Sequence, residues 1–365
     1  MTGFPIRLSG TPRARGRAQA DAAGPLAAAV REAVRGRLAE AEDMLARADV
    51  RAHLAALRAR TATLDAPATA ELAGLAEGYG LADDALFAML HLAVAADWAG
   101  RPEQGDGCTA WARGGASGVV VKNRDYGGRW PLPSAVFHLS DPTWRGAILC
   151  VGSLGAPGVY SSGINADGLA LADTHIAARD TGVGLLRYFV MTRVLAQCAD
   201  VEQALAALRA LPHAGGGSLV LADRSGAIAA VELGHRALAV ERGEGWVART
   251  NHFVSPELAA ATRVDQARAW ANDNSHARLA AIRSALAQGA AHEAADRHRA
   301  VMASHDRPGQ AGLCRHGGGA DSVTLSTAIY DIAAGQLEIA EAPPCQAPWA
   351  RYAIASTPPA APGGD

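Results

Sequence analysis

The hydrophobic pattern of the chain changes its period close to Gly100. Before that point Ala, Leu, Arg and Glu recur with helical spacing, as in Leu26, Val30, Val34 and Leu38. After it, short β-branched or alternating segments are broken by Gly, Pro and Asp, a pattern typical of strands and turns. The part before Gly100 therefore predicts a helical layer, and the part after it predicts a fold built mainly on sheets.

Helical spacing returns at three places after Gly100, in residues 185–198, 201–211 and 274–288. Between them the strand-like segments come in pairs joined by turns, for example across Asp223–Gly226. Hairpins make neighbouring strands antiparallel. The chain therefore predicts an α+β fold of antiparallel sheets covered by helices, rather than a doubly wound parallel sheet.

The composition excludes several classes of function. Hydrophobic residues make up 49% and charged residues 19% of the 365 positions, and the formal net charge is −2. This balance provides no electrostatic attraction to nucleic acid or to an anionic membrane surface. No apolar run predicts a membrane span, and no apolar stretch follows the N-terminal arginines as it would in a signal peptide. We therefore expect a cytoplasmic protein without nucleic-acid or membrane partners.

The cysteines predict neither a disulfide framework nor a zinc site. There are five of them, an odd number, and no pair has the Cys-x-x-Cys spacing. We expect a reducing compartment, no metal and no cofactor.

A stretch of reactive side chains follows the change of pattern. Cys108 stands between Gly107 and Thr109, and a Gly/Ser turn, three valines and the polar cluster Lys122–Tyr126 come next. Two strands joined by this turn would return the cluster to Cys108. Taken alone, Cys108 is more simply a buried, inert thiol. Beside the arginine and the aspartate of the cluster it becomes a candidate nucleophile.

Three further motifs carry polar side chains, and each also has a simpler structural interpretation. Asn165, in Gly-Ile-Asn-Ala-Asp-Gly-Leu, is typical of a turn, and Asn251, in Thr-Asn-His-Phe, of an amide that caps a loop. Asn274 or Ser275 could be a helix N-cap, with Arg278 a surface residue of that helix.

Taken in order, these motifs resemble the peptidase C45 family. The segments that carry the resemblance are Gly-Cys-Thr, Asn-Arg-Asp-Tyr, Gly-x-Asn-x-x-Gly-Leu, Thr-Asn-His-Phe and Asn-Ser-x-x-Arg, together with the opening Leu8–Gly16. The family comprises relatives of the acyl-coenzyme A:6-aminopenicillanic acid acyltransferase and, more distantly, of the choloylglycine hydrolases. The resemblance extends from about residue 5 to residue 345.

The resemblance implies the fold of the N-terminal nucleophile (Ntn) hydrolases. This is a four-layer αββα sandwich of two antiparallel sheets, here with an N-terminal helical region. It also implies that the chain cuts itself between Gly107 and Cys108. Residues 1–107 would then be a mostly helical pro-segment or α chain, and residues 108–355 the catalytic β chain. We expect the Pro- and Gly-rich tail, residues 356–365, to be disordered.

The resemblance also assigns roles at the site. Cys108 would be the nucleophile, and its freed α-amino group, with an ordinary pKa of about 8, its general base. Asp125 would orient that amino group, and Arg124 would favour the thiolate or touch the substrate. Asn251 would donate its side-chain amide to the oxyanion. Gly107 would allow the strained backbone that self-cleavage requires.

Further residues would support the site. Asn165 is a second candidate polar group, and Arg278 would fix the site through an ion pair or bind a substrate carboxylate. Thr109 and Tyr126 flank the reactive residues as supporting or substrate-binding groups. Three hydroxyl residues are candidates for promoting self-cleavage: Ser322, Thr324 and Ser326.

One departure from the family pattern bears on the substrate. Arg124 stands where the family commonly has a tryptophan, whereas Tyr126 keeps an aromatic residue that the family often has. The substrate expected from the resemblance is a small amide or an acyl thioester. Neither the acyl group, nor the amine, nor the choice between hydrolysis and transfer follows from the sequence.

Two other functions are alternatives. One is a conventional cysteine amidase in an uncut chain, with a histidine such as His252 as its base. The other is a non-catalytic binding protein that keeps the fold. A homodimer of processed protomers is an assembly that the sequence neither requires nor excludes.

Overall fold

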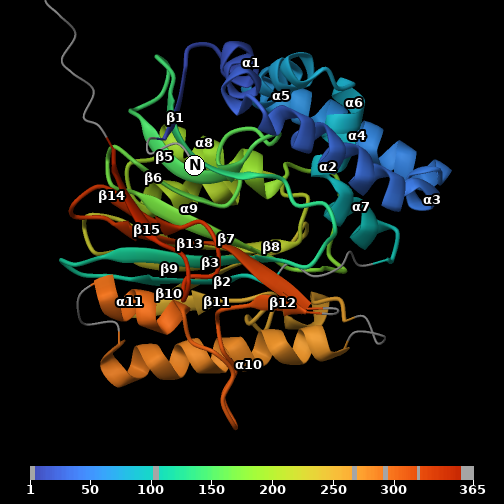
Figure 1. Ribbon diagram of the computed structural model, residues 1–365. Helices are drawn as coiled ribbons and strands as arrows, with labels where there is room; N and C mark the ends of the chain where they lie inside the picture. Colours follow the sequence, from blue (N-terminus) through green and yellow to red (C-terminus); the bar gives the residue numbers. More distant parts are fainter. Residues whose placement is uncertain (1–4, 102–106, 265–268, 291–294, 319–320, 355–365) are drawn as a thin grey trace, which may run out of the picture.

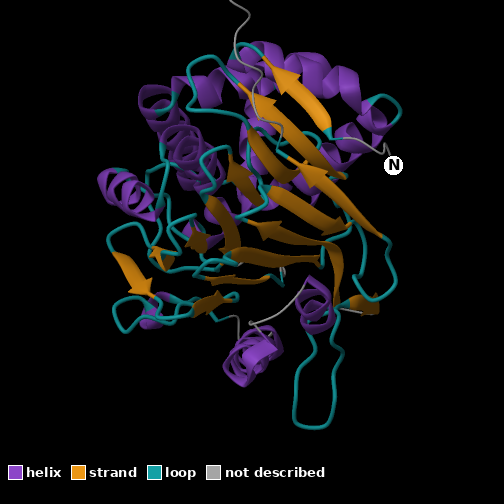
Figure 2. Cartoon of the chain, turned by 90° about the vertical axis from the view of Figure 1, so that its left-hand side faces the viewer, coloured by secondary structure: helices purple, strands orange, loops and turns teal. Residues whose placement is uncertain are grey.

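The computed structural model describes residues 5–101, 107–264, 269–290, 295–318 and 321–354. The tail expected to be disordered, residues 356–365, lies outside these ranges. The described helices and strands form four layers (Figures 1 and 2): helices, a first sheet, a second sheet, and helices again. The α+β sandwich of two sheets with an N-terminal helical region is thus confirmed.

The N-terminal helices cover the outer face of the first sheet (Figure 1). They are α1 (Pro12–Ala23), α2 (Leu26–Glu40), α3 (Glu42–Leu45), α4 (Ala48–Leu64), α5 (Ala66–Tyr79), α6 (Asp83–Leu90) and α7 (Leu92–Trp98). Local sequence sets several of their ends. Thr11 caps α1 through Ala14 N and Pro12 opens it, while Asp65 caps α5 and Gly80 ends it in a left-handed conformation. Within the described residues, no helix is both long and apolar enough to cross a membrane.

The first sheet has eight strands, in the order β1-β4-β5-β6-β7-β8-β9-β10. Their bounds are β1 (Ile6–Ser9), β4 (Ser134–Ser140), β5 (Ile148–Ser153), β6 (Ser162–Asn165), β7 (Ala170–His175), β8 (Gly217–Ala222), β9 (Ile228–Leu233) and β10 (Leu238–Arg242). Helices α8 (Arg187–Gln197) and α9 (Val201–Ala210) join the helical layer outside it. The pairing is antiparallel except between β1 and β4, which run parallel.

The second sheet follows the order β11-β2-β3-β13-β14-β15, with β12 added beside β13. Its strands are β2 (Thr109–Arg113), β3 (Val119–Tyr126), β11 (Trp246–Arg249), β12 (His316–Gly318), β13 (Asp321–Asp331), β14 (Gln336–Ala340) and β15 (Trp349–Ala353). Helices α10 (Ala269–Ala285) and α11 (Ala295–Met302) cover its outer face (Figure 1).

Three apolar cores separate the four layers. The first lies between the N-terminal helices and the first sheet and includes Leu75 and Phe137. The second lies between the sheets and includes Val120 and Val151. The third lies under α10 and α11 and includes Trp111. Because side chains alternate along β2 and β3, Val120 faces the other sheet while its neighbours face the outer helices.

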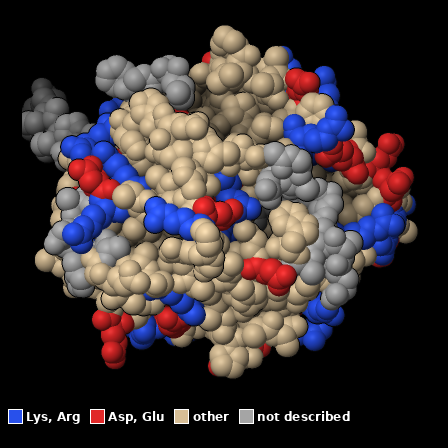
Figure 3. Space-filling model, turned by 60° about the horizontal axis from the view of Figure 1, so that its bottom comes forward, with Lys and Arg blue, Asp and Glu red and all other residues tan. Residues whose placement is uncertain are grey.

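Charged side chains on the face shown in Figure 3 are mixed in sign. Lysines and arginines lie among aspartates and glutamates and are separated by uncharged residues. This distribution matches the near-neutral formal charge of −2.

Some elements differ from the sequence expectation. The helix expected at 274–288 already begins at Ala269, so Asn274 lies inside it and is not its N-cap. Asn274 instead accepts a hydrogen bond from the Arg278 side chain one turn later. Strand β12 was not expected, because its residues are His-Gly-Gly, which have low strand propensity. Its pairing with β13 forms it.

Helices α1 and α5 approach closely because each has a glycine at the contact. A Cβ on Gly16 would overlap the Glu71 carbonyl oxygen, and a Cβ on Gly74 would overlap the Arg13 carbonyl oxygen. Any larger residue at either position must push the two backbones apart. This contact fixes the N-terminal helices against one another.

We predict that Gly74→Ala lowers the free energy of unfolding by about 1–3 kcal/mol, since overpacking outweighs the gain of about 1 kcal/mol in helix propensity. Denaturant unfolding of the full chain measures the change. Gly245→Ala is the control, because a Cβ there meets no atom within 4 Å. Equal stability of the two variants would contradict the close-contact explanation.

Candidate active site

Cys108 immediately precedes β2, which pairs with β3. In their antiparallel register Thr109 lies opposite Asn123, and Arg113 lies opposite Val119. The hairpin expected from the sequence is thus confirmed, and it brings the polar end of β3 beside Cys108. The cysteine is buried, at 4% exposed, and lines a small pocket of about 30 Å³.

A buried guanidinium holds the backbone around Cys108. Arg278 of α10 donates from Nη1 to the Cys108 carbonyl oxygen at 2.6 Å and to Thr109 Oγ1 at 2.9 Å. Its Nη2 donates to Asn251 Oδ1 at 2.8 Å, and its Nε donates to Asn274 Oδ1 at 2.8 Å. Arg278 is therefore no surface residue. It fixes the site through hydrogen bonds to neutral oxygens, where the sequence had offered an ion pair or a substrate carboxylate as its partner.

Asn251 follows β11 and directs its side-chain oxygen at the Cys108 backbone nitrogen, 2.9 Å away. The same oxygen accepts from Arg278, and two donors on one atom fix the orientation of the amide. Its Nδ2 donates to the His175 carbonyl oxygen at 2.8 Å, and its backbone N–H donates to Ser275 Oγ at 2.8 Å. Asn251 thus positions the Cys108 nitrogen, an orienting contact that the sequence did not suggest.

Asp125 and two hydroxyl residues of β13 lie around Gly107. Asp125 Oδ1 accepts a hydrogen bond from Thr324 Oγ1 at 2.7 Å. A Cβ on Gly107 would lie 3.3 Å from Asp125 Oδ2 and 3.2 Å from Ser322 Oγ. The close approach of these two side chains leaves little room for a larger residue at position 107. Ser326, the third hydroxyl candidate, is buried opposite Arg124 in the β3–β13 ladder.

Polar side chains of β3, β7, α2, α8 and the loop between β5 and β6 line the pocket beside Cys108. They are Arg37, Lys122, Arg124, Tyr126, Tyr160, Asp173, His175, Arg187 and Tyr188. Four cations therefore surround one carboxylate. Asp173 forms ion pairs with Lys122 and with Arg187, whose Nε lies 2.6 Å from Oδ2. Although burial favours the protonated acid, these two cations hold the pKa of Asp173 below its ordinary value.

Arg124 and Tyr126 project from β3 into this pocket, as the sequence had proposed for substrate-facing groups. Arg124 donates to Ser153 Oγ at 2.8 Å, and its guanidinium lies 5.2 Å from the centre of the Tyr160 ring. The Tyr126 ring lies under the Arg37 guanidinium at 4.8 Å. The strand therefore places a cation and an aromatic ring in the same small space as the thiol.

Asn165 lies in the first sheet and does not line this pocket. Its Nδ2 donates to the carbonyl oxygens of Leu195 at 2.9 Å and Cys198 at 2.7 Å, and its Oδ1 accepts from the Leu169 N–H at 2.9 Å. It ties the β6–β7 turn to the end of α8. The expectation that Asn165 is a second polar group of the site is corrected, and the turn interpretation fits.

His252 lies behind the site rather than in it. Its Nδ1 is 2.8 Å from Ser275 Oγ, and its ring stacks on His276 at a centroid distance of 3.7 Å. Burial lowers the pKa of His252 to about 3, and His276 adds to the shift. His175, unlike His252, lines the pocket that contains Cys108, so it is the histidine closer to the candidate nucleophile's pocket.

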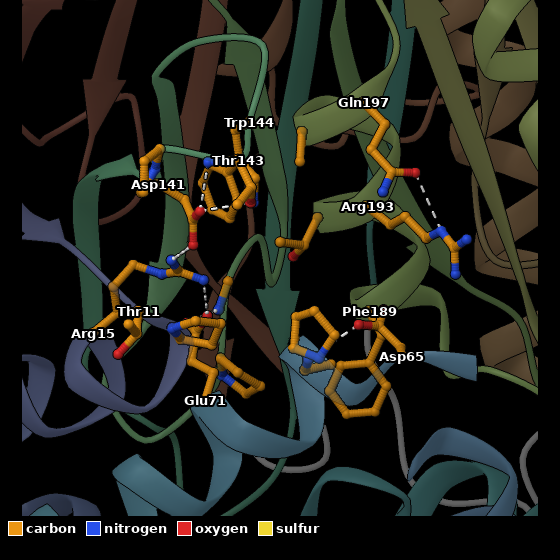
Figure 4. Close-up of a pocket in the computed structure, with 18 of the residues that line it drawn as sticks. Thr11, Arg15, Asp65, Glu71, Asp141, Thr143, Trp144, Phe189, Arg193 and Gln197 are labelled. Carbon is orange, nitrogen blue, oxygen red and sulfur yellow. Dashed lines mark hydrogen bonds and ion pairs between the residues drawn. The ribbon is translucent and has the colours of Figure 1, made fainter. Parts of the chain in front are cut away.

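A larger cavity, of about 510 Å³, lies between α1, α5, α8 and the loop after β4 (Figure 4). Arg15 lies at its edge, 2.9 Å from a Glu71 oxygen and 2.5 Å from an Asp141 oxygen. No cysteine or histidine is among the described residues that line it, and none of them lines the pocket at Cys108. This cavity is larger than the pocket at Cys108, but the reactive side chains place the candidate site at Cys108.

The sequence interpretation missed three charged residues of the pocket. Lys122, Asp173 and Arg187 form a buried network beside the nucleophile candidate. A signal was present, because Asp-Thr-His ends the strand-like segment at 170–175 and Lys122 follows three valines. Charged residues in apolar strands are rarely buried without a partner. That rule indicates a pairing, but it does not identify the partner.

Comparison with known proteins identifies a matching family model. A family model described as "Acyl-coenzyme A:6-aminopenicillanic acid acyl-transferase" matches residues 111–345. No curated protein sequence matches the chain. Among solved structures, a mutant of conjugated bile acid hydrolase from Clostridium perfringens matches at 14% identity, with a TM-score of 0.42, over 64% of this chain and 88% of that one. Penicillin V acylase from Agrobacterium tumefaciens matches at 15% identity, with a TM-score of 0.37, over 64% and 82%.

The buried His252 predicts an acid-sensitive fold. Above its ordinary pKa of 6.5 the imidazole is neutral in both states, so it has no effect on stability. Below that value the unfolded chain binds a proton at His252. In the folded chain the pKa of His252 is about 3, so the imidazole stays neutral. Between pH 7 and pH 5 this residue should lower the free energy of unfolding by on the order of 1–2 kcal/mol.

Denaturant unfolding at both pH values, for wild type and for His252→Asn, measures this contribution. The asparagine keeps a polar group near Ser275 but cannot titrate, so its loss of stability on acidification should be smaller. Equal losses in the two proteins would contradict the assignment.

Proposed function

This chain belongs to the acyl-coenzyme A:6-aminopenicillanic acid acyl-transferase family, and we propose that it is a self-processing cysteine Ntn enzyme. It cuts itself before Cys108 and then hydrolyses or transfers acyl groups through a thioester on that residue. One observation carries the proposal: the Cys108 backbone nitrogen is already held by Asn251 Oδ1 at 2.9 Å. In the processed enzyme this nitrogen is the α-amino group that serves as the base.

Self-cleavage needs only groups that surround the Gly107–Cys108 bond. The Cys108 sulfur attacks the Gly107 carbonyl carbon, and a tetrahedral oxyanion forms. Collapse breaks the peptide bond, the Cys108 nitrogen takes up the proton lost by the thiol, and the Gly107 acyl group passes to sulfur. Water then hydrolyses this thioester and frees the thiol, and the proton of the new Gly107 carboxylic acid passes to the Cys108 amine, which leaves a carboxylate and an α-ammonium group. Asp125, fixed by Thr324, lies where it can stabilise the new ammonium.

Turnover repeats the same chemistry on a substrate. The α-amino group takes the Cys108 thiol proton, and the thiolate attacks the substrate carbonyl carbon. Asn251 has a second Nδ2–H besides the one given to His175, and this N–H can donate to the oxyanion. The leaving amine or thiolate takes a proton from the ammonium. Water or an acceptor amine then attacks the thioester and frees the enzyme.

The N-terminal piece stays with the enzyme after the cut. Strand β1 pairs with β4, and the helices of residues 12–98 share a continuous apolar core with the first sheet. Arg37 of α2 also lines the pocket at Cys108. Residues 1–107 therefore act as an α chain that contributes to the site and is not released.

The pocket favours a polar acyl group. In the continuous chain its free space, about 30 Å³, holds only a water molecule or two, so a substrate enters only after the surrounding residues move. Four cationic side chains against one carboxylate leave an excess of positive charge. Amides and acyl thioesters that carry a carboxylate are thus the first compounds to test, together with uncharged analogues of the same size.

We expect the purified wild-type chain to separate under denaturing conditions into residues 1–107 and 108–365, because the Cys108 thiol cuts the bond before it. Cys108→Ala should give a single uncut mass and no turnover. Intact-mass measurement reads the cut directly. Cys198→Ala is the matched control, because its thiol lies outside the pocket, and it should be cut like wild type.

An uncut wild-type chain would contradict self-processing. If the uncut chain still converted a substrate, the result would favour the alternative of an uncut cysteine amidase. His175→Ala should then abolish its activity, because that histidine lines the pocket. An uncut chain without turnover would favour the binding-protein alternative. Turnover by Cys108→Ala would remove Cys108 as the nucleophile.

Asn251→Ala should slow self-cleavage and lower kcat of the cut fraction by on the order of 10²–10³, the range found for loss of one oxyanion donor. Steady-state kinetics, normalised to processed protein, provide the measurement. Asn165→Ala is the control, since that amide only ties a turn to α8. It should lower stability without changing kcat per folded molecule. Similar kcat losses in both variants would mean that Asn251 acts only through folding.

A further inference from the structure

Four metal-binding side chains meet at one point away from the pocket at Cys108. They are His305, Cys314, His316 and Cys345, and their ligand atoms all lie within 4.8 Å of one another. His305 and Cys314 belong to the loop between α11 and β12, and His316 lies in β12. Cys345 comes from the separate loop between β14 and β15. Cys314 is buried, and the other three are exposed.

The distances among these atoms fit one tetrahedral ion. The two Nε2 atoms of His305 and His316 are 3.0 Å apart, and the sulfurs of Cys314 and Cys345 are 3.6 Å apart. His316 Nε2 lies 3.5 Å from Cys314 Sγ and 3.3 Å from Cys345 Sγ. Zinc bonds of about 2.3 Å to sulfur and about 2.0–2.1 Å to nitrogen, at tetrahedral angles, separate such ligands by about 3.3–3.8 Å. These four separations agree with the zinc values within about 0.3 Å, and His305 Nε2 lies within 4.8 Å of both sulfurs.

We propose that these four residues form a structural zinc site. Two thiolates and two neutral imidazoles are the Cys₂His₂ set that tetrahedral zinc prefers. Binding of Zn²⁺ displaces the two thiol protons, so two negative sulfurs balance the charge of the ion. With four protein ligands the coordination is complete, which is typical of a structural rather than a catalytic zinc.

Backbone hydrogen bonds hold the ligands in place independently of an ion. The Ser304 carbonyl oxygen accepts from the N–H groups of Leu313 and Cys314, both at 2.9 Å, and so closes the loop that carries two ligands. The Pro343 carbonyl oxygen accepts from Gln346 and Ala347 at 3.0 Å and forms the turn around Cys345. Such a preformed arrangement lowers the entropy cost of binding an ion.

This proposal departs from the sequence expectation of no zinc site. It rested on the absence of Cys-x-x-Cys spacing, which detects only sites whose ligands come in local pairs. Here the two cysteines are 31 positions apart, and Cys345 is 29 positions from His316. Strand pairing within the second sheet, from β12 through β13 and β14 to β15, brings the two loops together.

The proposed zinc site is linked by hydrogen bonds to the hairpin of β2 and β3, which follows Cys108. The Leu313 carbonyl oxygen, next to Cys314, accepts a hydrogen bond from Asn123 Nδ2 of β3 at 2.8 Å. The Arg315 N–H donates to Thr324 Oγ1 at 2.9 Å, and that hydroxyl donates to Asp125. An ion that fixes residues 305–316 to the 341–348 loop therefore also steadies the neighbours of Asp125.

The test is metal analysis of the full-length chain purified without chelator from zinc-supplemented cells. We expect one zinc per chain by elemental analysis and by native mass spectrometry. Cys345→Ser and His305→Ala, which change exposed ligands, should fold and lose the zinc. Arg307→Ala, in the same loop but outside the ligand set, should keep it. A wild-type chain without zinc, or ligand variants that bind as much as wild type, would overturn the proposal.

Two further measurements separate the zinc from other states of the cysteines. Cobalt(II) added to the zinc-free wild-type chain should give the visible absorption and thiolate charge-transfer bands of a tetrahedral sulfur site, and these should be absent in Cys345→Ser. Intact mass under non-reducing, denaturing conditions should show no Cys314–Cys345 disulfide. A disulfide in the freshly purified chain would overturn the proposal, because it consumes both sulfur ligands. None of these readouts depends on enzymatic activity.

Discussion

The buried guanidinium of Arg278 is the interaction on which the candidate active site depends. It is 2% exposed, and its hydrogen bonds reach the start of β2, Asn251 in the segment after β11, and its own helix α10. A buried cation is tolerated only where its donors are satisfied, so these oxygens are held in fixed positions. Burial lowers the pKa of Arg278, while the nearby Asp125 and Cys108 favour its charged form. The same constraint that stabilises the cation therefore sets the position of the Cys108 backbone.

Strand β3 divides the chemistry between its two faces. Lys122, Arg124 and Tyr126 face the pocket, whereas Asn123 and Asp125 face the hydroxyls of β13 and the loop after α11. Alternation of side chains makes this separation unavoidable in an extended strand. As a result, the groups available to a substrate and the groups next to the Gly107–Cys108 bond lie on opposite sides of one strand.

The outer regions of the molecule contribute to the site through packing and pairing. The N-terminal helices supply Arg37 to the pocket and share the first apolar core with the sheet beneath them. On the opposite side, the His and Cys cluster closes the loops behind β3. The buried Lys122–Asp173–Arg187 network lies between, and links the second sheet to the first sheet and to α8. Positions far apart in the chain thus define the site around Cys108.

The sequence by itself determined the features that depend on local interactions. The helical layer, the hairpins and the return of Arg124 and Asp125 to Cys108 followed from periodicity and from turn residues, because these act over a few positions. The order of the motifs along the chain was enough to indicate the family. Tertiary structure decided what long-range packing controls. It assigned Asn251 to the site and Asn165 to a turn, although both looked alike in sequence. It also gave Lys122 its buried partners, and it joined Cys345 to a histidine-rich loop 29 or more positions away. Such pairings depend on which surfaces meet when the sheets stack, and no local pattern of residues encodes that.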